Sequence, residues 1–427
     1  MPDPAALARS TIETIWRIEA PRLIGGLVRI VRDLDLAEDL AQDALLVALE
    51  CWPATGIPDN PGAWLMTTAK HRAIDAGRRR TMMDGTHAAI HAETPTWTAA
   101  NEDALVGAID GLVDDDVLRL ILISCHPVLS PDARTALTLR LVAGFSTPEI
   151  ARAFLTTEPT IQQRIVRAKR ALAAARVPFE TPVGDDLRAR LPLVLEVVYL
   201  LFNEGYAATA GDDWMRPALC DEAQRLGRLL AGLVPGEAEV HALLALMELQ
   251  ASRLRARTMS DGTPVLLADQ DRRRWDRLLI TRGLASLARA ESLARPLGPY
   301  ALQAAIAACH ARAPSMDDTD WAAVVALYDA LVALAGSPVV ELNRAVAVSM
   351  AFGPAEALPL VEALATDKAL ARYHLLPAVR GDLLLKLGRH GEARAELERA
   401  AELATNARER ALLLARAGTV PVPGGLM

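Results

Sequence analysis

The sequence predicts an all-α protein: two small helical domains, the second carrying a helix-turn-helix, followed by a larger domain of helical repeats. Three observations favour this class. Hydrophobic residues make up 52% of the 427 residues but aromatic residues only 4%, so the apolar content is mainly aliphatic. Ala and Leu favour helices, whereas sandwiches and barrels draw on aromatic and β-branched residues. Apolar residues also recur at helical spacing along most of the chain. A stretch without a usable period predicts a linker over 82–101, and we expect domains at 1–81, 102–182 and 183–427.

The charge of the chain is unevenly distributed. The net charge is −7, from 46 basic and 53 acidic residues, so no basic body exists that binds nucleic acid by bulk electrostatics. However, Asp33 to Glu50 holds six acids and no Lys or Arg, whereas Thr67 to Arg80 and Pro159 to Arg176 hold five basic residues each. One acidic and two basic surfaces predict different partners.

The four cysteines form neither a CxxC pair nor a short-spaced cluster with histidines. This pattern fits neither a disulfide framework nor a zinc site, so we expect no metal and no cofactor. The first residues lack the basic and apolar character of a signal peptide, and no apolar run reaches the ~18 residues that a membrane span needs. We expect a cytoplasmic protein without a membrane partner.

The acidic segment predicts an amphipathic helix from Asp33 to Glu50. At 100° per residue, its apolar face holds Leu36, Leu40, Ala44 and Val47, and its polar face holds Asp35, Glu38, Asp39 and Gln42. Leu46 falls in the middle of the polar face. An apolar residue ringed by carboxylates indicates either the centre of a docking patch or one stray leucine on a solvated face.

The first basic segment follows the turn Asn60-Pro61-Gly62 and predicts a helix from near Ala63. Its apolar stripe is expected at Leu65, Ala69, Ala73 and Ala76, and its opposite face at Trp64, Thr68, His71 and Asp75. A Trp beside basic residues suits contact with phosphates and an unstacked base. The alternative is a core Trp and arginines that favour a helix C-terminus.

The second basic segment predicts a helix-turn-helix. Ser146 and Glu149 have the capping-box spacing, a short helix follows from Pro148 to Phe154, and Pro159 restarts a helix. On this second helix the apolar stripe is Ile161, Ile165, Ala168 and Leu172, and the opposite face holds Thr160, Gln163, Arg164 and Arg167. Gln can read adenine and Arg can read guanine in the major groove. The alternative is a helical hairpin with solvated basic residues.

These segments, in this order, resemble the sigma factors of bacterial RNA polymerase, in particular the extracytoplasmic-function group, which keeps only sigma regions 2 and 4. The stretches that carry the resemblance are DLAEDLAQDALLVALECW, NPGAWLMTTAKHRAIDAGRRR and STPEIARAFLTTEPTIQQRIVRAKRAL. It covers Thr11 to about Pro182. The third stretch begins its second helix with Pro-Thr-Ile-Gln-Gln-Arg where the family commonly has Gly-Thr-Val-Lys-Ser-Arg, and Lys70-His71 replaces the common Arg-Asn, so the promoter sequence is not predicted.

The resemblance implies three groups of site residues and two partners, core RNA polymerase and promoter DNA. The clamp of the largest polymerase subunit would be bound by Asp39, Gln42, Asp43 and Leu46. The −10 element would be melted and bound by Trp64, Thr67, Lys70, His71, Arg78, Arg79 and Arg80. The −35 element would be bound by Thr160, Gln162, Gln163, Arg164, Arg167, Lys169 and Arg170.

The second half of the chain predicts helices almost throughout, among them AEVHALLALMELQASRLRAR and DRRRWDRLLITRGLASLARAESL. Near the end, ELNRAVAVSMAFGPAEALPLVEAL repeats in AVRGDLLLKLGRHGEARAELERAAEL with Ala357 over Ala393, a period of 36. This is close to the ~34 of tetratricopeptide hairpins, whose groove has room for a protein or small-molecule ligand. The half resembles the long tetratricopeptide-like extension of one subgroup of these sigma factors.

No enzyme site is predicted. Cys125-His126 is followed by Pro127 with no third group in reach, and Tyr199, Asn203, Glu204 and Tyr206 bring no nucleophile and base together. The leading expectation is a sigma factor that directs initiation, with its extension acting in cis. The alternatives are a helix-turn-helix regulator that never engages core polymerase and a scaffold that uses only the repeats.

Overall fold

The computed structural model describes residues 4–84, 113–154, 156–179, 182, 184–208 and 213–421. Within these ranges the regular structure is helical, and the only extended pairing is an isolated bridge between Thr258 and Pro264. The expected all-α class is therefore confirmed. The chain divides into two compact units, residues 1–197 and 198–427.

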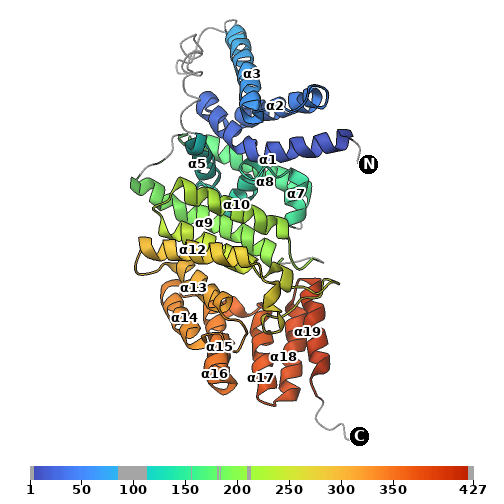
Figure 1. Cartoon of the computed structure of the whole chain (residues 1–427), viewed down its shortest axis with the longest axis vertical. Coiled ribbons are helices and arrows are strands. Elements are labelled where there is room, and N and C mark those ends of the chain that lie inside the picture. Colours follow the sequence, from blue (N-terminus) through green and yellow to red (C-terminus); the bar gives the residue numbers. More distant parts are fainter. Residues whose placement is uncertain are drawn as a thin grey trace. The chain divides into compact units, whose positions relative to one another are not determined.

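The first unit contains the three segments singled out above (Figure 1). Its helices are α1 (Pro4–Val31), α2 (Leu34–Thr55), α3 (Pro61–Asp84), α5 (Val113–Ser124), α6 (Pro131–Leu141), α7 (Thr147–Ala153), α8 (Glu158–Ala174) and the first part of α9 (Gly184–Tyr206). The start of the expected linker, up to Asp84, continues α3, and the rest of that linker lies outside the described residues.

Short polar side chains set the beginnings of α2 and α3. Asp33 accepts a hydrogen bond from the backbone N–H of Leu36 at 3.0 Å and caps α2, whose first turn lacks intrahelical acceptors. Asn60 accepts from the N–H of Ala63 at 3.0 Å, so α3 begins at Pro61, slightly earlier than expected. The predicted apolar stripe of α3 is buried at Leu65, Ala69 and Ala73, and the side chain of Ala76 lies outside the described residues.

A glycine pair in the middle of α1 permits a close approach of two neighbouring helices. Gly25 faces the backbone of Asp116 on α5, where an added Cβ would lie 2.4 Å from the Asp116 carbonyl oxygen. At the neighbouring Gly26, a Cβ would lie 3.0 Å from the Met66 side chain of α3. Glycine costs roughly 1 kcal/mol relative to alanine inside a helix. Glycine at both positions therefore leaves room for the neighbouring helices.

The helix-turn-helix forms as predicted from its caps and stripe. Ser146 N–H donates to Glu149 Oε2 at 2.8 Å, which completes the capping box before α7. Thr157 caps α8. All four residues of the predicted stripe on α8 are buried, namely Ile161, Ile165, Ala168 and Leu172.

The second unit is a succession of helical pairs. After the end of α9 come α10 (Pro217–Leu233), α11 (Ala238–Ala251), α12 (Arg277–Leu293), α13 (Pro299–Arg312), α14 (Trp321–Ala335), α15 (Pro338–Phe352), α16 (Pro354–Leu364), α17 (Leu375–Lys386), α18 (His390–Leu403) and α19 (Ala407–Thr419). Figure 1 shows α17, α18 and α19 side by side, in red.

The two segments aligned at a period of 36 form matching hairpins, α15–α16 and α17–α18. Ala357 and Ala393 occupy corresponding positions on the second helices and are both fully buried. Each hairpin turns at a glycine with positive φ, Gly353 at 100° and Gly388 at 75°, a conformation that disfavours other residues. The internal repetition seen in the sequence is therefore present in the structure.

Two expected helices are shorter than the sequence indicated. The helix expected over Asp271–Leu293 begins only at Arg277, because Asp276 caps it by accepting from Leu278 N–H at 2.9 Å, and Arg272–Arg274 form a 3-10 turn instead. Likewise, α11 ends at Ala251 and a 3-10 turn follows over Leu254–Ala256. None of the described helices is both long and apolar enough to cross a membrane.

Candidate polymerase and nucleic-acid interfaces

The exposed face of α2 centres on a leucine surrounded by polar groups. Leu46 is 57% exposed, and Asp39 is exposed two turns before it on the same face. Partial burial raises the pKa of Asp39; Lys169 opposes this shift, and Glu38, Asp35 and Asp43 reinforce it. The predicted group Asp39, Gln42, Asp43 and Leu46 thus places two carboxylates and an amide beside an exposed leucine, and we call it the acidic patch.

Glu38 departs from its predicted place on the solvated face. It is only 5% exposed, because Arg140 of α6 donates to it at 2.7 Å and Lys169 of α8 pairs with it at 2.6 Å. Gln42 also donates to Glu38, at 2.8 Å. Burial of this carboxylate is tolerated because cationic groups and a hydrogen bond satisfy it.

The contact around Glu38 joins the acidic helix to the helix-turn-helix. Lys169 bridges Glu38 and Asp35, the latter at 2.7 Å, and its side chain is 12% exposed. Burial disfavours its charge, but the field of Glu38 and the hydrogen bonds to Asp35 and Glu38 outweigh burial and raise the pKa of Lys169. Lys169 therefore stays charged and is held within the protein in this structure.

A cleft of ≈ 590 Å³ runs beside the acidic patch. Its apolar floor comes from α1 and α2, and its far wall comes from the end of α6 and the start of α7. It is lined by Trp16, Ala20, Ile24, Glu38, Gln42, Leu45, Leu46, Leu49, Arg140, Gly144, Ser146 and Glu149. Part of the predicted polymerase-binding face thus borders the region that carries the helix-turn-helix.

The predicted −10 residues on α3 differ in exposure. Thr67 and His71 are exposed, whereas Lys70 is half-buried and engaged by other groups. Trp64 is also half-buried, because its ring meets the buried Trp52 of α2 edge to face at 5.2 Å. The side chains of Arg78, Arg79 and Arg80 lie outside the described residues.

One residue of α3 that was not predicted from the sequence as a site residue, Arg72, pairs with the acidic patch on α2. Arg72 Nη1 lies 3.4 Å from Asp43 Oδ2, and both side chains are about half exposed, 46% and 47%. In the sequence, Arg72 could have been recognised as a site residue from its position on the same polar face as Thr68 and His71. An exposed pair of this kind contributes little stability, on the order of 0.5 kcal/mol.

The predicted −35 residues lie on α8, opposite its buried stripe. Thr160, Gln162, Gln163, Arg167 and Arg170 are exposed. Arg164 is half-buried and pairs with Asp132 at 3.2 Å, whereas Lys169 forms the contact described above. The exposed set presents amide and guanidinium groups, which are the groups that hydrogen-bond to base edges and phosphates.

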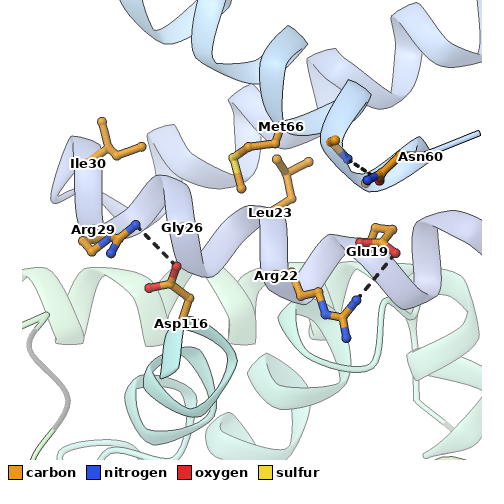
Figure 2. Close-up of a pocket in the computed structure, with 11 residues that line it drawn as sticks. Glu19, Arg22, Leu23, Gly26, Arg29, Ile30, Asn60, Met66 and Asp116 are labelled. Atoms are coloured by element: carbon orange, nitrogen blue, oxygen red, sulfur yellow. Dashed lines mark hydrogen bonds and ion pairs between the residues drawn. The ribbon is translucent and has the colours of Figure 1, made fainter. Parts of the chain in front are cut away.

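A second pocket in the first unit, of ≈ 310 Å³, lies between α1 and the start of α3 (Figure 2). Figure 2 shows Leu23 and Met66 on its walls, with Arg22 paired to Glu19 at one end and Arg29 paired to Asp116 at the other. Its charges already have partners of opposite sign. The pocket is therefore a feature of the helix packing at the glycine pair.

The cysteine–histidine pair has the environment of a packed helix end. Cys125 is buried, its Sγ lies 3.4 Å from Thr138 Oγ1, and burial raises the pKa of its thiol to about 11. Burial and the charge of Arg190 lower the pKa of His126, whose Nδ1 accepts from Val128 N–H at 3.2 Å. Within the described ranges no cluster of His, Cys, Asp or Glu is arranged to hold a metal ion.

Comparisons with known proteins bear on the same segments. Residues 15–82 match the family model of Sigma-70 region 2, and residues 119–172 match that of Sigma-70, region 4. The RNA polymerase sigma factor CarQ of Myxococcus xanthus is 34% identical over 34% of this chain and 76% of its own length. The ECF RNA polymerase sigma factor SigK of Mycobacterium ulcerans is 28% identical over 35% of this chain and 78% of its own length.

The chain belongs to the extracytoplasmic-function sigma factors of the sigma-70 family. This sigma factor carries a further domain, because residues 190–291 match a family of unknown function, DUF6596. The protein R00370 of Rhizobium meliloti is 47% identical over 92% of each chain, so it matches both halves of the sigma factor. No solved structure matches this sigma factor.

Proposed function

We propose that this sigma factor, acting in the cytoplasm, binds core RNA polymerase through the acidic patch on α2, binds and opens the −10 element with α3, and binds the −35 element with α8. A role in transcription initiation follows from the family. The assignment of particular residues to the polymerase clamp, the −10 element and the −35 element is the proposal. Bond chemistry is not part of this role, since strand opening would come from capture of unstacked bases on the Trp64 face.

The observation that best supports polymerase binding is the exposure of Leu46. A leucine that is 57% exposed, with Asp39, Gln42 and Asp43 on the two turns before it, resembles an interface centre with polar residues at its edge. Burial of such a residue in an interface contributes on the order of 2 kcal/mol. The acidic rim would select a basic partner surface and repel DNA.

The test is binding of the full chain to core polymerase, together with transcription from promoters selected from a genomic library. Leu46→Arg should weaken core binding by roughly 30-fold, equivalent to about 2 kcal/mol. Leu334→Arg on α14 is the matched control, because Leu334 is equally exposed at 59% but lies in the extension. Unchanged core binding by Leu46→Arg, with DNA binding retained, would favour the regulator that does not engage polymerase.

We further propose that the extension forms a tetratricopeptide-like domain that regulates the sigma module in cis. Its size supports a dedicated role, since residues 183–427 outnumber residues 1–182, and the matching hairpins α15–α16 and α17–α18 support the repeat assignment. A chain ending at Pro182 should differ from the full chain in promoter-specific transcription. Equal activity of the two, with the shorter chain shown to be folded by circular dichroism, would contradict cis regulation.

A further inference from the structure

The extension carries a strongly basic surface in a chain whose net charge is negative. Between residues 253 and 282 there are eight arginines and four aspartates, with no lysine or glutamate. Four of these arginines, Arg255, Arg273, Arg274 and Arg277, line an open hollow of ≈ 710 Å³ with Trp275, Asp276 and Leu278. All four are exposed. We call this the arginine surface.

The arginine surface is built on a fixed turn. Arg272, the first arginine of the run, is only 8% exposed and donates hydrogen bonds to the carbonyl oxygens of His310 and Ala313 at 2.7 Å each. It also donates to Thr319 Oγ1 at 3.2 Å and lies over the ring of Trp275, which is 3% exposed. Arg273 and Arg274 lie between these two anchored residues, and both are exposed.

Two of the aspartates beside the arginine surface are already engaged within the protein. Asp276 caps α12, accepting from Leu278 N–H at 2.9 Å and Leu279 N–H at 3.1 Å. Asp271 is engaged by Arg273 at 3.0 Å, which holds the pKa of Asp271 below its ordinary value.

The other three arginines of the surface lack such partners. Across the ranges that the structure describes, no carboxylate forms an ion pair with Arg255, Arg274 or Arg277. Guanidinium groups keep their charge at any physiological pH, so these three positive charges are constant.

The shape of the surface indicates what it binds. The hollow is shallow and wide, so it does not enclose a small anion, but it suits a chain of anions lying across it. Guanidinium forks bind phosphate oxygens in pairs, and the amino end of α12, where Arg277 is the first helical residue, adds a partial positive charge. A phosphate backbone fits both the charge and the shape.

We propose that the arginine surface binds the phosphate backbone of duplex DNA. The choice of DNA over an acidic protein segment rests on the proposed function, because a sigma factor engaged at a promoter is already held on a duplex. Such contacts carry no sequence information; they add affinity that falls steeply with salt. The extension would thereby contribute DNA binding that is independent of the two promoter-reading helices.

The test is the salt dependence with which the full chain binds a non-specific DNA duplex. The test variant combines Arg255→Gln, Arg274→Gln and Arg277→Gln. Its slope of log affinity against log salt should be shallower by about 2.7, because each phosphate that an arginine neutralises adds ~0.9 to the magnitude of that slope. Between roughly 50 and 200 mM salt, the affinity of the wild-type chain should fall about 40-fold more than that of the variant. The matched control combines Arg312→Gln, Arg372→Gln and Arg399→Gln, three exposed arginines elsewhere in the extension.

Each outcome decides the proposal. An unchanged slope in the arginine-surface variant overturns it, and so does an equal flattening in the control, which would reflect bulk charge alone. Weakened binding to core polymerase with an unchanged slope also overturns it and assigns the surface to an acidic protein. Arg→Lys at the same three positions should retain most of the slope.

A second measurement avoids substitutions altogether. DNA at low salt should protect Arg255, Arg274 and Arg277 of the wild-type chain from an arginine-modifying dicarbonyl reagent, as read by mass spectrometry. Absence of protection would count against the proposal even if the variants failed to fold. Neither the salt dependence nor the protection measurement needs polymerase or a promoter, so failure of the proposed sigma function would appear only in the core-binding and transcription assays.

Discussion

Replacing Gly25 by alanine should loosen the packing of α1 on α5, although alanine is the better helix former. The new Cβ would lie 2.4 Å from the carbonyl oxygen of Asp116 and 2.8 Å from its carbonyl carbon. Both are backbone atoms of a residue that is 7% exposed, so no side-chain rotation relieves the clash. Either α5 moves away from α1 or the backbone of one helix distorts.

The magnitude follows from two opposing effects. Alanine in place of glycine inside a helix gains about 1 kcal/mol, and forcing an extra carbon into a packed contact costs about 1–3 kcal/mol. Gly25→Ala should therefore destabilise the α1–α5 contact by about 1 kcal/mol. Gly232 near the end of α10 has no atom within 4 Å of its would-be Cβ, so Gly232→Ala should slightly stabilise its helix.

The assay is amide hydrogen exchange of the full chain, followed by mass spectrometry. Amides of α5 should exchange about 5-fold faster in Gly25→Ala, the factor that corresponds to about 1 kcal/mol, whereas amides of α10 should exchange no faster in Gly232→Ala. Slower exchange of α5 in Gly25→Ala would refute the reasoning. It would mean that α1 and α5 are not packed together in solution and that the glycine pair acts only through helix propensity.

Two further predictions concern titratable groups. Burial and the charges of two nearby arginines lower the pKa of His310 from 6.5 to about 4, so the unfolded chain takes up this proton first as the pH falls. The stability of the second unit should decline from pH 6.5 towards pH 4 by on the order of 3 kcal/mol, and His310→Gln should remove that decline in thermal unfolding. Burial raises the pKa of Cys125 to about 11 and of Cys220 to about 12, whereas Cys51 is exposed. Iodoacetamide at neutral pH should therefore label Cys51 in the folded chain and the other two only after unfolding; early labelling of Cys125 would contradict its burial.

Local features of the helices could be predicted from the sequence because they depend on neighbouring residues. The capping box at Ser146 and Glu149 and the stripe from Ile161 to Leu172 involve spacings of three and four residues, which any helix brings together. The exposure of Leu46 was predicted in the same way, from the angular positions of residues within one helix.

Features that depend on a partner far along the chain could not be predicted in this way. Glu38 was placed on a solvated face because a single helix gives no sign of Arg140, which follows 102 residues later and covers it. Likewise, the stretch that begins at Asp271 was expected to be helical, yet Arg272 lies in a 3-10 turn and is buried by acceptors 38 to 47 residues away. In both cases a charged side chain is buried because distant groups satisfy it.

The Glu38 contact also constrains how this protein can change over generations. Reversal of the charge at position 38 alone would leave Arg140 and Lys169 facing a like charge in a nearly closed space, a costly intermediate. Descendants that keep the contact are therefore expected to alter positions 38, 140 and 169 together or not at all. Lys169 lies on the helix proposed to bind the −35 element. A substitution of Lys169 that alters promoter preference would therefore be expected together with a substitution of Glu38, which belongs to a different sigma region.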